Sequence, residues 1–457
     1  MEAEIGRVYL ECGVDITYVE KLILKQEMNK HARVMVKAYL SENAGKSAVT
    51  SITSGTNVRV NYVIKDKTEE RNILLFEGMP TKVNVTCENG IYTMELAAVS
   101  ATYQLDIQKK SRSFQDTSKT YRDIMKQIIM QENSGQCVFS GKVDEKIGIP
   151  YIQYEETDWQ FLKRLASRIN SFLIPNMSNG KMQIYVGVPT RSTQELKEDR
   201  YEKVRDAWEQ NMYRVWSKSE HQLCDMVSFA GDTYSIWKKE AEFHDEALWF
   251  CYELRKKEKW EQYPKWNKKL AGATLEGKVL EVKGNRMRLH LSIDEKQEKE
   301  KAYWYPYATE FSCSNQVGGY HMPEAGEQVL LRIPSCKEEL AYIATVKRSD
   351  GAGNSKTSDP KTRYFESAEG KTIQLSQDTL SFTPTEGISI TLTDSGGIDI
   401  TSSSKVAIEA DKEISLSGKT ITLDGADTIE LATSGGTINQ KDKIDIYAPS
   451  GVKQIVC

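Results

Sequence analysis

The stretch that decides the fold is residues 388–431, ISITLTDSGGIDITSSSKVAIEADKEISLSGKTITLDGADTIEL. Pairs of apolar residues with one residue between them recur here at steps of mostly seven or eight residues, and polar or glycine turns separate the pairs. Alternate residues of a strand point to the same face, so each pair predicts a short strand with two inward side chains. The pairs, which begin before this stretch and continue to residue 446, are Ile373/Leu375, Leu380/Phe382, Ile388/Ile390, Ile398/Ile400, Val406/Ile408, Ile414/Leu416, Ile421/Leu423, Ile429/Leu431 and Ile444/Ile446.

A strand with only two inward side chains cannot form a core alone, so neighbouring repeats must stack to supply one. The competing interpretation is low-complexity disorder, because Ser, Thr and Gly dominate the segment. Disorder would not keep β-branched pairs in register over so many repeats. The sequence therefore predicts a coiled, β-helical stack from about residue 372 to residue 446.

The rest of the chain divides by composition, and 457 residues suggest roughly two to four domains. Residues 1–270 mix strands with two helices. About five short strands in residues 273–347 favour a small barrel of the OB-fold type. A small, polar, glycine-containing linker at 348–360 precedes the β-helical segment, 361–457. The predicted fold class is mainly β with some α.

Two helices are expected in the first domain. The first covers 121–130, where Tyr121, Ile124, Met125, Ile128 and Ile129 repeat at helical spacing. The second follows Thr157, which forms a capping box with Gln160, and Asn170 is its expected end. Its buried face is Leu162, Leu165, Ala166 and Ile169.

Three short glycine-containing stretches predict hairpin turns between strands. They are Asn89-Gly90, Ser178-Asn179-Gly180 and Lys283-Gly284-Asn285.

Nothing in the residue pattern indicates catalysis, a metal or a cofactor. The eight cysteines contain no CxxC pair, and the five histidines are dispersed without an HxH or HExxH motif. The net charge of −4 does not favour bulk binding to nucleic acid. Tryptophans within 200–269 could stack on bases, but acidic residues are interleaved with them, and acidic residues also slightly outnumber basic ones in 273–347.

The sequence also limits where the protein is expected. No segment approaches the roughly 20 apolar residues that cross a bilayer, and residues 1–5 show neither a basic start nor an apolar signal region. We therefore expect assembly in the cytoplasm, followed by any export through a route that needs no signal.

Specific motifs resemble the VgrG family and the related hub-and-spike proteins of contractile phage tails, tail-like bacteriocins and extracellular injection particles. Residues 154–166, YEETDWQFLKRLA, resemble a helix signature of the family hub, with Tyr154, Thr157, Asp158, Trp159, Phe161, Leu162 and Leu165 at the matching positions. Residues 275–279 and 322–329 resemble the family's OB domain. The order hub, OB barrel and β-helix is the same over nearly the whole chain.

The resemblance implies a homotrimer with no enzymatic activity. Each hub would contribute two β-barrels, and three C-terminal segments would intertwine into a needle with the apolar pairs of 388–446 facing the trimer axis. The implied partners are tail tube and baseplate proteins, cargo effectors in some systems, and a target envelope that is pierced mechanically. A separate PAAR-type tip protein would dock near the C-terminus, at Val452, Ile455 and Cys457.

Some members of the resembled family carry a lysozyme domain, and some phage spikes bind iron through an HxH motif. This sequence has no room for a lysozyme domain, and it has no histidine after His321 for such an iron site. The alternative hypothesis is a β-helical carbohydrate-binding or carbohydrate-active protein. The acidic residues of the repeat region lie mostly at turns or strand edges without basic partners, which is more typical of solvated edges than of a sugar site.

Overall fold

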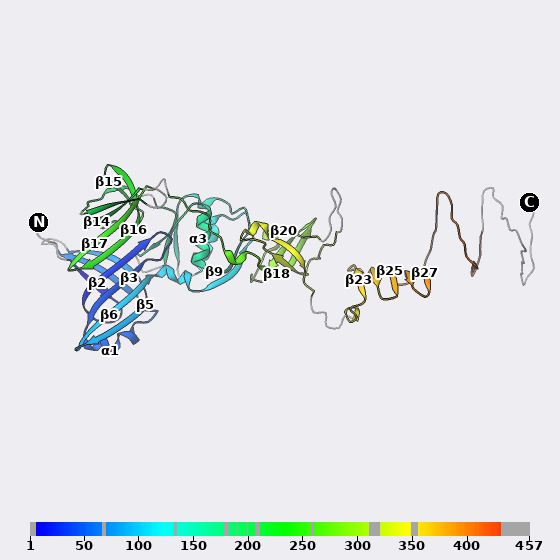
Figure 1. Cartoon of the computed structure of the whole chain (residues 1–457), viewed down its shortest axis with the longest axis horizontal. Helices are drawn as coiled ribbons and strands as arrows, with labels where there is room; N and C mark the ends of the chain where they lie inside the picture. Colours follow the sequence, from blue (N-terminus) through cyan, green and yellow to red (C-terminus); the bar gives the residue numbers. More distant parts are fainter. Residues whose placement is uncertain are drawn as a thin grey trace, which may run out of the picture. The chain divides into compact units, whose positions relative to one another are not determined.

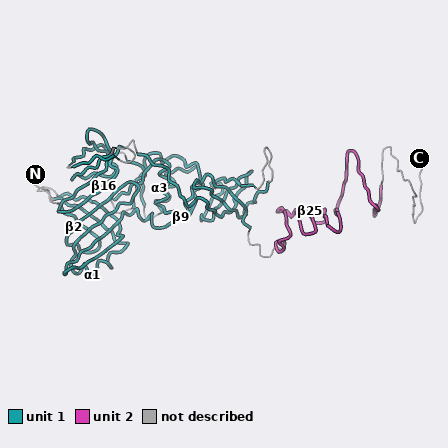
Figure 2. The backbone as a smooth tube through the Cα atoms, in the orientation of Figure 1, with its two compact units in different colours: residues 1–350 teal, residues 351–457 magenta. Residues whose placement is uncertain are grey.

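The chain forms two compact units, Met1–Asp350 and Gly351–Cys457 (Figures 1 and 2). The computed structural model describes residues 6–65, 70–131, 135–177, 182–189, 191–198, 200–205, 211–256, 260–309, 320–348 and 355–430. The boundary between the units falls within 348–360, the expected linker.

The largest element of the first unit is a twelve-stranded sheet with two lobes. The first lobe contains β1 (Gly6–Glu11), β2 (Ile16–Glu27), β3 (Arg33–Leu40), β4 (Val58–Lys65), β5 (Glu70–Glu88) and β6 (Ile91–Ser100). The second contains β12 (Thr193–Glu195), β13 (Arg200–Arg205), β14 (Asn211–Ser217), β15 (Met226–Phe229), β16 (Asp232–His244) and β17 (Ala247–Arg255). Antiparallel pairing of β2 with β16 joins the lobes.

Both lobes contribute to one hydrophobic core. Leu24 and Phe76 from the first lobe and Val215, Ile236 and Tyr252 from the second have no exposed surface. Strand β5 turns into β6 at Asn89-Gly90, as the sequence predicts, and both residues have positive φ. A shared core and a continuous sheet make the two lobes one folded body.

The described strands form two lobes of one open sheet, whereas the resemblance to the VgrG family predicts two β-barrels. Strand β1 pairs only with β4 and β13 only with β14 among the described residues, and no ladder joins β1 to β2. The edges of these strands therefore carry backbone groups without a ladder partner in this part of the chain.

The part of the chain between the two lobes forms a separate layer that contains two helices. Its helices, α2 (Tyr121–Met130) and α3 (Asp158–Arg168), confirm the two predictions. Strands β7 (Lys109–Phe114) and β9 (Tyr151–Thr157) pair, and β8 (Gln136–Phe139), β10 (Leu173–Asn176) and β11 (Gln183–Val186) form a small sheet. The predicted hairpin of β10 and β11 is present, although its turn lies outside the described residues.

A third helix, α1 (Glu42–Ser51), was not predicted. Ser41 caps it by accepting a hydrogen bond from the backbone of Ala44 at 3.3 Å. Its buried residues are only Ala44, Gly45 and Ala48, so the sequence lacks the stripe of large apolar residues by which a helix is recognised.

Residues 274–346 form a five-stranded sheet in the order β20-β19-β18-β21-β22. Its strands are β18 (Thr274–Lys283), β19 (Arg286–Leu291), β20 (Trp304–Pro306), β21 (Gln328–Arg332) and β22 (Tyr342–Val346). The predicted turn after Lys283 joins β18 to β19, and a parallel bridge between Tyr307 and Ile343 connects the two ends of the sheet. Leu289, Leu331 and Ile343 are completely buried in the hydrophobic core of this sheet.

Short 3₁₀ turns complete the first unit and begin the second. They are η1 (Ala101–Asp106), η2 (Lys142–Asp144), η4 (Lys268–Leu270), η5 (Lys299–Lys301), η6 (Glu338–Leu340) and η7 (Ser355–Thr357). The described residues contain no helix that is long and apolar enough to cross a membrane.

The second unit contains an antiparallel meander of five strands. They are β23 (Arg363–Glu366), β24 (Thr372–Leu375), β25 (Thr379–Thr385), β26 (Ile388–Thr393) and β27 (Gly397–Ser402). Gly387, in the turn before β26, and Gly397, the first residue of β27, have positive φ. Residues 403–430 form no strand, so the strands predicted at Val406/Ile408, Ile414/Leu416, Ile421/Leu423 and Ile429 are not formed within the described chain.

Candidate functional site: the network at α3 and the apolar face of the C-terminal sheet

The signature residues gather at the start of α3. Thr157 caps the helix by accepting a hydrogen bond from the backbone N–H of Gln160 at 3.1 Å, and the Gln160 side chain accepts one from the backbone N–H of Thr157 at 3.4 Å. The predicted capping box is therefore present. Asn170, with a φ of 47°, follows the helix end at the expected position. The side chains of Trp159, Phe161, Leu162 and Leu165 pack into the core between α2 and α3.

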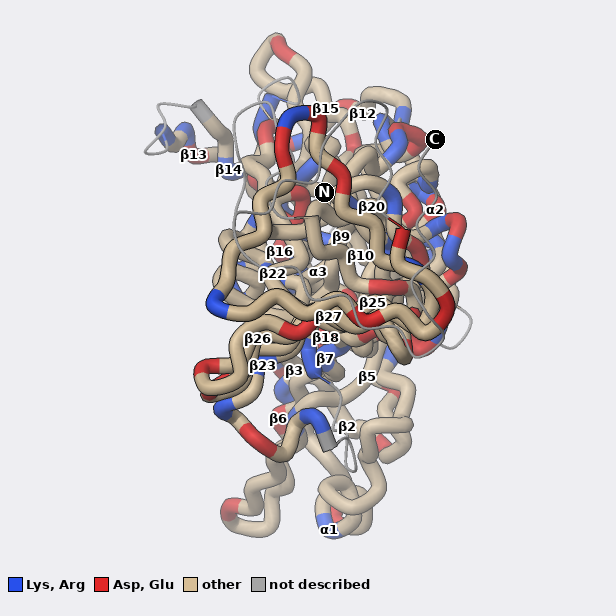
Figure 3. The backbone as a smooth tube through the Cα atoms, turned by 90° about the vertical axis from the view of Figure 1, so that its right-hand side faces the viewer, with Lys and Arg blue, Asp and Glu red and all other residues tan. Residues whose placement is uncertain are grey.

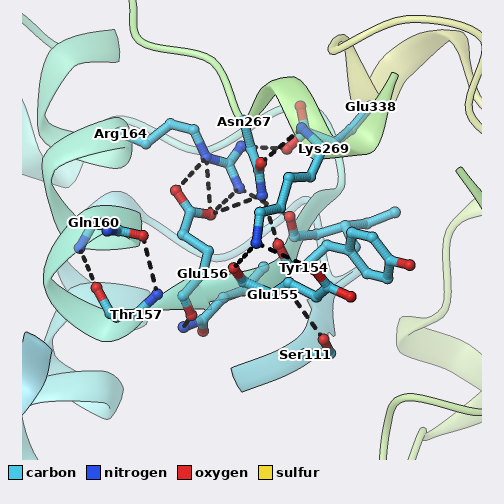
Figure 4. A network of polar contacts seen from close by, with 12 residues as sticks. Ser111, Tyr154, Glu155, Glu156, Thr157, Gln160, Arg164, Asn267, Lys269 and Glu338 are labelled. Atoms are coloured by element: carbon cyan, nitrogen blue, oxygen red, sulfur yellow. Dashed lines mark hydrogen bonds and ion pairs between the residues drawn. The ribbon is translucent and has the colours of Figure 1, made fainter. Parts of the chain in front are cut away.

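A buried arginine lies on the same helix (Figure 4). The Arg164 guanidinium donates to the Ile152 carbonyl at 2.8 Å and to Glu156 Oε2 at 3.0 Å, and it forms a second ion pair with Glu338. The Arg164 side chain is 1% exposed and that of Glu338 is fully buried. Burial raises the pKa of Glu156, while the charge of Arg164 acts in the opposite direction. The single positive charge of Arg164 is thus paired with the carboxylates of both Glu156 and Glu338 in a buried site.

This network joins the helical layer to the five-stranded sheet of residues 274–346. Glu338 belongs to η6, between β21 and β22. A separate contact joins the same two parts, because Asp294, after β19, accepts hydrogen bonds from the backbone N–H of Ser113 on β7 at 2.6 Å and from its hydroxyl at 2.5 Å.

Polar contacts also attach the segment that leads into β18 to strand β9 (Figure 4). Asn267 donates to the Tyr154 carbonyl at 2.7 Å, and Lys269 lies 3.1 Å from Glu155. Polar contacts from several elements therefore join the helical layer to the five-stranded sheet that begins with β18.

A second polar cluster joins α3 to the first lobe. The imidazole of His31 lies 2.9 Å from Thr102 Oγ1 and 3.4 Å from Asp106, and its ring centroid is 4.1 Å from that of Trp159. Asp106 also accepts a hydrogen bond at 2.5 Å from the hydroxyl of Thr157, the cap of α3. Burial lowers the pKa of His31 to about 4, although Asp106 opposes the change. His31 is therefore neutral near pH 7.

Asp158, the first residue of α3, forms two ion pairs with β7. Its carboxylate lies 2.7 Å from Lys110 Nζ and 2.6 Å from Arg112 Nη2. Negative charge at a helix N-terminus is favoured by the helix dipole, so the same carboxylate stabilises both the helix and its contact with β7.

The C-terminal sheet has one apolar face. Residues directly opposite each other in a ladder lie on the same face, and the registers of β23 to β27 align two columns of apolar side chains. This apolar face comprises Phe365, Ile373, Phe382, Ile390 and Ile400 in one column, and Leu375, Leu380, Leu392 and Ile398 in the other. The opposite face carries polar residues, including Gln374, Ser381, Thr391 and Asp399.

The described part of the second unit buries none of its residues. Seven of the nine side chains on the apolar face are exposed, from 38% for Ile373 to 67% for Ile398, and the other two, Leu380 and Leu392, are half-buried. The sequence-predicted residues Ile390, Ile398, Ile400, Val406, Ile408, Ile414, Leu416, Ile421, Leu423 and Ile429 are all exposed, and Ile388 is half-buried. A contiguous apolar face of this kind marks an interaction surface.

Other predicted residues lie outside the described part of the chain. They are Leu431, Ile444 and Ile446 from the repeat, and Val452, Ile455 and Cys457 near the C-terminus. No group of three or more His, Cys, Asp or Glu side chains suitable for a metal occurs among the described residues.

Sequence reasoning missed the charged part of the α3 network. Arg164 and Glu156 lie inside the quoted motif, but no pattern marks them as partners, and Glu338 is 174 positions from Arg164. Phe365 was also missed, because the residue two positions before it is Arg363 and no apolar pair forms.

We predict that Arg164→Met lowers the free energy of unfolding by about 3–5 kcal/mol, because it leaves buried carboxylates without their cation. Urea unfolding followed by tryptophan fluorescence measures this loss. The matched control is Lys46→Met, which removes an exposed ion pair to Glu42 on α1 and should change stability by about 0.5 kcal/mol or less. Equal effects of the two substitutions would contradict a stabilising role for the network.

We also predict that His31 makes the protein less stable as the pH falls from about 6.5 to about 4. The unfolded chain takes up a proton through the usual pKa of histidine, whereas the folded chain does not until about pH 4, so the proton favours unfolding across this window by up to about 3 kcal/mol. His31→Gln should flatten the dependence of Tm on pH between 7 and 4.5.

His244→Gln, at a half-exposed histidine of the β16–β17 hairpin, is the control for this measurement. It should leave the slope of Tm against pH unchanged. A slope in His31→Gln as steep as in the unsubstituted protein would show that another group is responsible.

Neither a comparison with protein-family models nor a comparison with curated protein sequences finds a match. Solved structures do match the fold. The Escherichia coli c3393 protein is described as a component of the type VI secretion system with structural similarity to the T4 phage tail proteins gp27 and gp5. It superposes with a TM-score of 0.56 at 14% identity, over 75% of this chain and all of that one.

The Francisella PdpA–VgrG complex in its half-lidded form gives a TM-score of 0.60 at 10% identity, over 87% of this chain and 88% of the other. The lidless form of the PdpA–VgrG complex gives 0.55 at 11% identity, over 84% and 93%. At these identities the matches establish the fold and not the function. The chain therefore has the fold of the VgrG-like hub-and-spike proteins.

Proposed function

We propose that the chain is the structural hub-and-spike subunit of a contractile injection machine and acts as a homotrimer. The observation that carries this proposal is the exposed apolar face of β23 to β27, in a unit whose described residues include none that is buried. The VgrG-like fold supports the same function. The role is mechanical, and no reaction is assigned to any residue.

Two further copies of the same chain suit this face because each carries an identical strip. Rotational symmetry brings identical strips together around one axis. The strip is only two side chains wide, about 7 Å along a strand, which suits a narrow three-sided prism better than the broad faces of a two-sheet sandwich. Each side chain covered in this way contributes about 1.5–3 kcal/mol.

The segment after β27 fits an intertwined β-helix. The apolar pairs continue from Val406 to Ile429 without strand partners in the described chain, so neighbouring copies would supply both the ladders and the hydrophobic contacts. Leu431, Ile444 and Ile446 would continue the same axis. The tip protein, of the PAAR type, would dock beyond them at Val452, Ile455 and Cys457.

The first unit would serve as the hub. In the trimer each of its lobes would act as one barrel of a ring that meets the tail tube and baseplate. Residues 273–347 would form an OB-fold collar, which the closing bridge between Tyr307 and Ile343 supports. The buried Arg164 network would keep collar and hub together under load.

The machine would assemble in the cytoplasm, with cargo effectors attached in some systems, and sheath contraction would drive the spike through a target envelope. A stiff, slowly unfolding needle is the property that this task requires.

We predict that Ile390→Asp combined with Ile400→Asp abolishes the trimer. These residues are opposite each other on β26 and β27, and their carboxylates would be placed on the axis of the assembly. Size-exclusion chromatography with light scattering measures the fraction of trimer in the full-length chain.

The matched control is Ser389→Asp combined with Thr401→Asp. These residues face each other on the same two strands but on the opposite face, so the added charge and strand repulsion are alike. The control should remain trimeric. Loss of the trimer in both variants, or in neither, would contradict axial packing of the apolar face.

A further inference from the structure

A narrow cavity lies where the two lobes and the helical layer meet. It has a volume of about 50 Å³, and its lining includes Gln26 from β2, Leu75 from β5, Tyr185 from β11 and Lys239 from β16. One water molecule needs about 10–15 Å³ of such volume, so the cavity has room for about three. Sites for small organic ligands are larger, about 300–1,000 Å³. The size of this cavity therefore suits water.

Gln26 brings an unpaired polar group to the cavity. Gln26 is 8% exposed, and its Oε1 atom is buried without a hydrogen-bond partner among the described residues. Its amide nitrogen donates only to the thioether sulfur of Met177, at 3.5 Å. Turning the amide around would leave the nitrogen unpaired instead, because a thioether sulfur has no hydrogen to donate to the oxygen. Either orientation leaves one polar atom of Gln26 in need of a partner.

Lys239 has unused donors beside the same cavity. It is 1% exposed, and its ammonium donates to Glu220 Oε1 at 2.8 Å and lies 5.0 Å from the centre of the Phe250 ring. An ammonium carries three N–H donors, and these contacts supply one oxygen acceptor from the described residues. Lys239 and Gln26 are opposite each other in the ladder of β2 with β16, so their side chains lie on the same face. They both border the cavity, yet Gln26 Oε1 is not hydrogen-bonded to the ammonium.

The charges at the cavity balance each other. Lys239 is paired with Glu220, and Arg191, which also lines the cavity, lies 2.6 Å from Asp225. Basic and acidic residues are interspersed along the chain, so no block of one sign adds a strong field (Figure 3). A neutral ligand that both donates and accepts hydrogen bonds therefore fits the cavity better than an ion.

We infer that the cavity binds a cluster of about three ordered water molecules and that one of them bridges Lys239 and Gln26. This water accepts a hydrogen bond from the Lys239 ammonium and donates one to Gln26 Oε1. The bridge joins β2 to β16 through side chains, in addition to the backbone ladder between the lobes. It also supplies a second oxygen partner to a buried cation. The inference does not depend on the proposed trimer.

A crystal structure of the full-length protein, at a resolution that shows ordered water, tests the site directly. We expect a density peak about 2.7–3.2 Å from both Lys239 Nζ and Gln26 Oε1. Gln26→Met keeps the length of the side chain but removes its polar atoms, so the peak should be lost in this variant. The matched control is Lys25→Met, at the preceding residue of β2, whose side chain is 62% exposed. It should leave the peak in place.

Two results of this experiment would overturn the inference. One is a map that resolves ordered water elsewhere in the core but has no peak at this position. The other is a peak that persists in Gln26→Met, because that water would not be held by Gln26.

Urea unfolding gives an independent readout in solution. Gln26→Met should lower the midpoint of unfolding, because the ammonium loses its bridged acceptor. The shift should be severalfold smaller in a Lys239→Met background, where the water has already lost its donor. Equal shifts in the two backgrounds would show that the two side chains are not coupled and would contradict the bridge.

Discussion

The apolar face of β23 to β27 is the constraint on which the account of the C-terminal unit depends. Nine apolar side chains align in two columns on one face, and the described residues of the unit provide nothing to cover them. Water contact over a contiguous apolar surface is unfavourable in proportion to its area. The described part of the unit therefore exposes a contiguous hydrophobic surface, which the proposed trimer would bury. The same argument extends to the segment from Val406 to Ile429, which has no strand partner among the described residues and whose large apolar side chains are exposed.

The first unit, in contrast, buries a large hydrophobic core within one chain. Its buried residues form three hydrophobic clusters, and the two polar networks at α3 join the helical layer to neighbouring parts. Arg164 is surrounded by Glu156 and Glu338, and breaking such a buried pair exposes a large desolvation penalty. His31 and Asp106 connect the cap of α3 to the first lobe. One eleven-residue helix thus contributes to both junctions.

Local signals predicted much of this fold. The stripe of Tyr121 to Ile129 and the box at Thr157 fixed both helices, because helical periodicity and capping act within a few residues. Helix α1 escaped prediction because its buried residues are small. The partnership of Arg164 with Glu338 could not be predicted, since it depends on how distant segments pack. The alternation in 388–400 predicted strands and their apolar face, but a single sequence does not reveal which chain provides the pairing for later repeats.

The most direct test of the central claim is the mass of the full-length protein in solution, measured by sedimentation velocity over a range of concentrations. The account predicts a species of about three times 51.9 kDa that persists on dilution, because the apolar face of each chain is buried by two others. A species of 51.9 kDa would mean that the apolar face remains in water or is covered within the chain, and it would contradict the account.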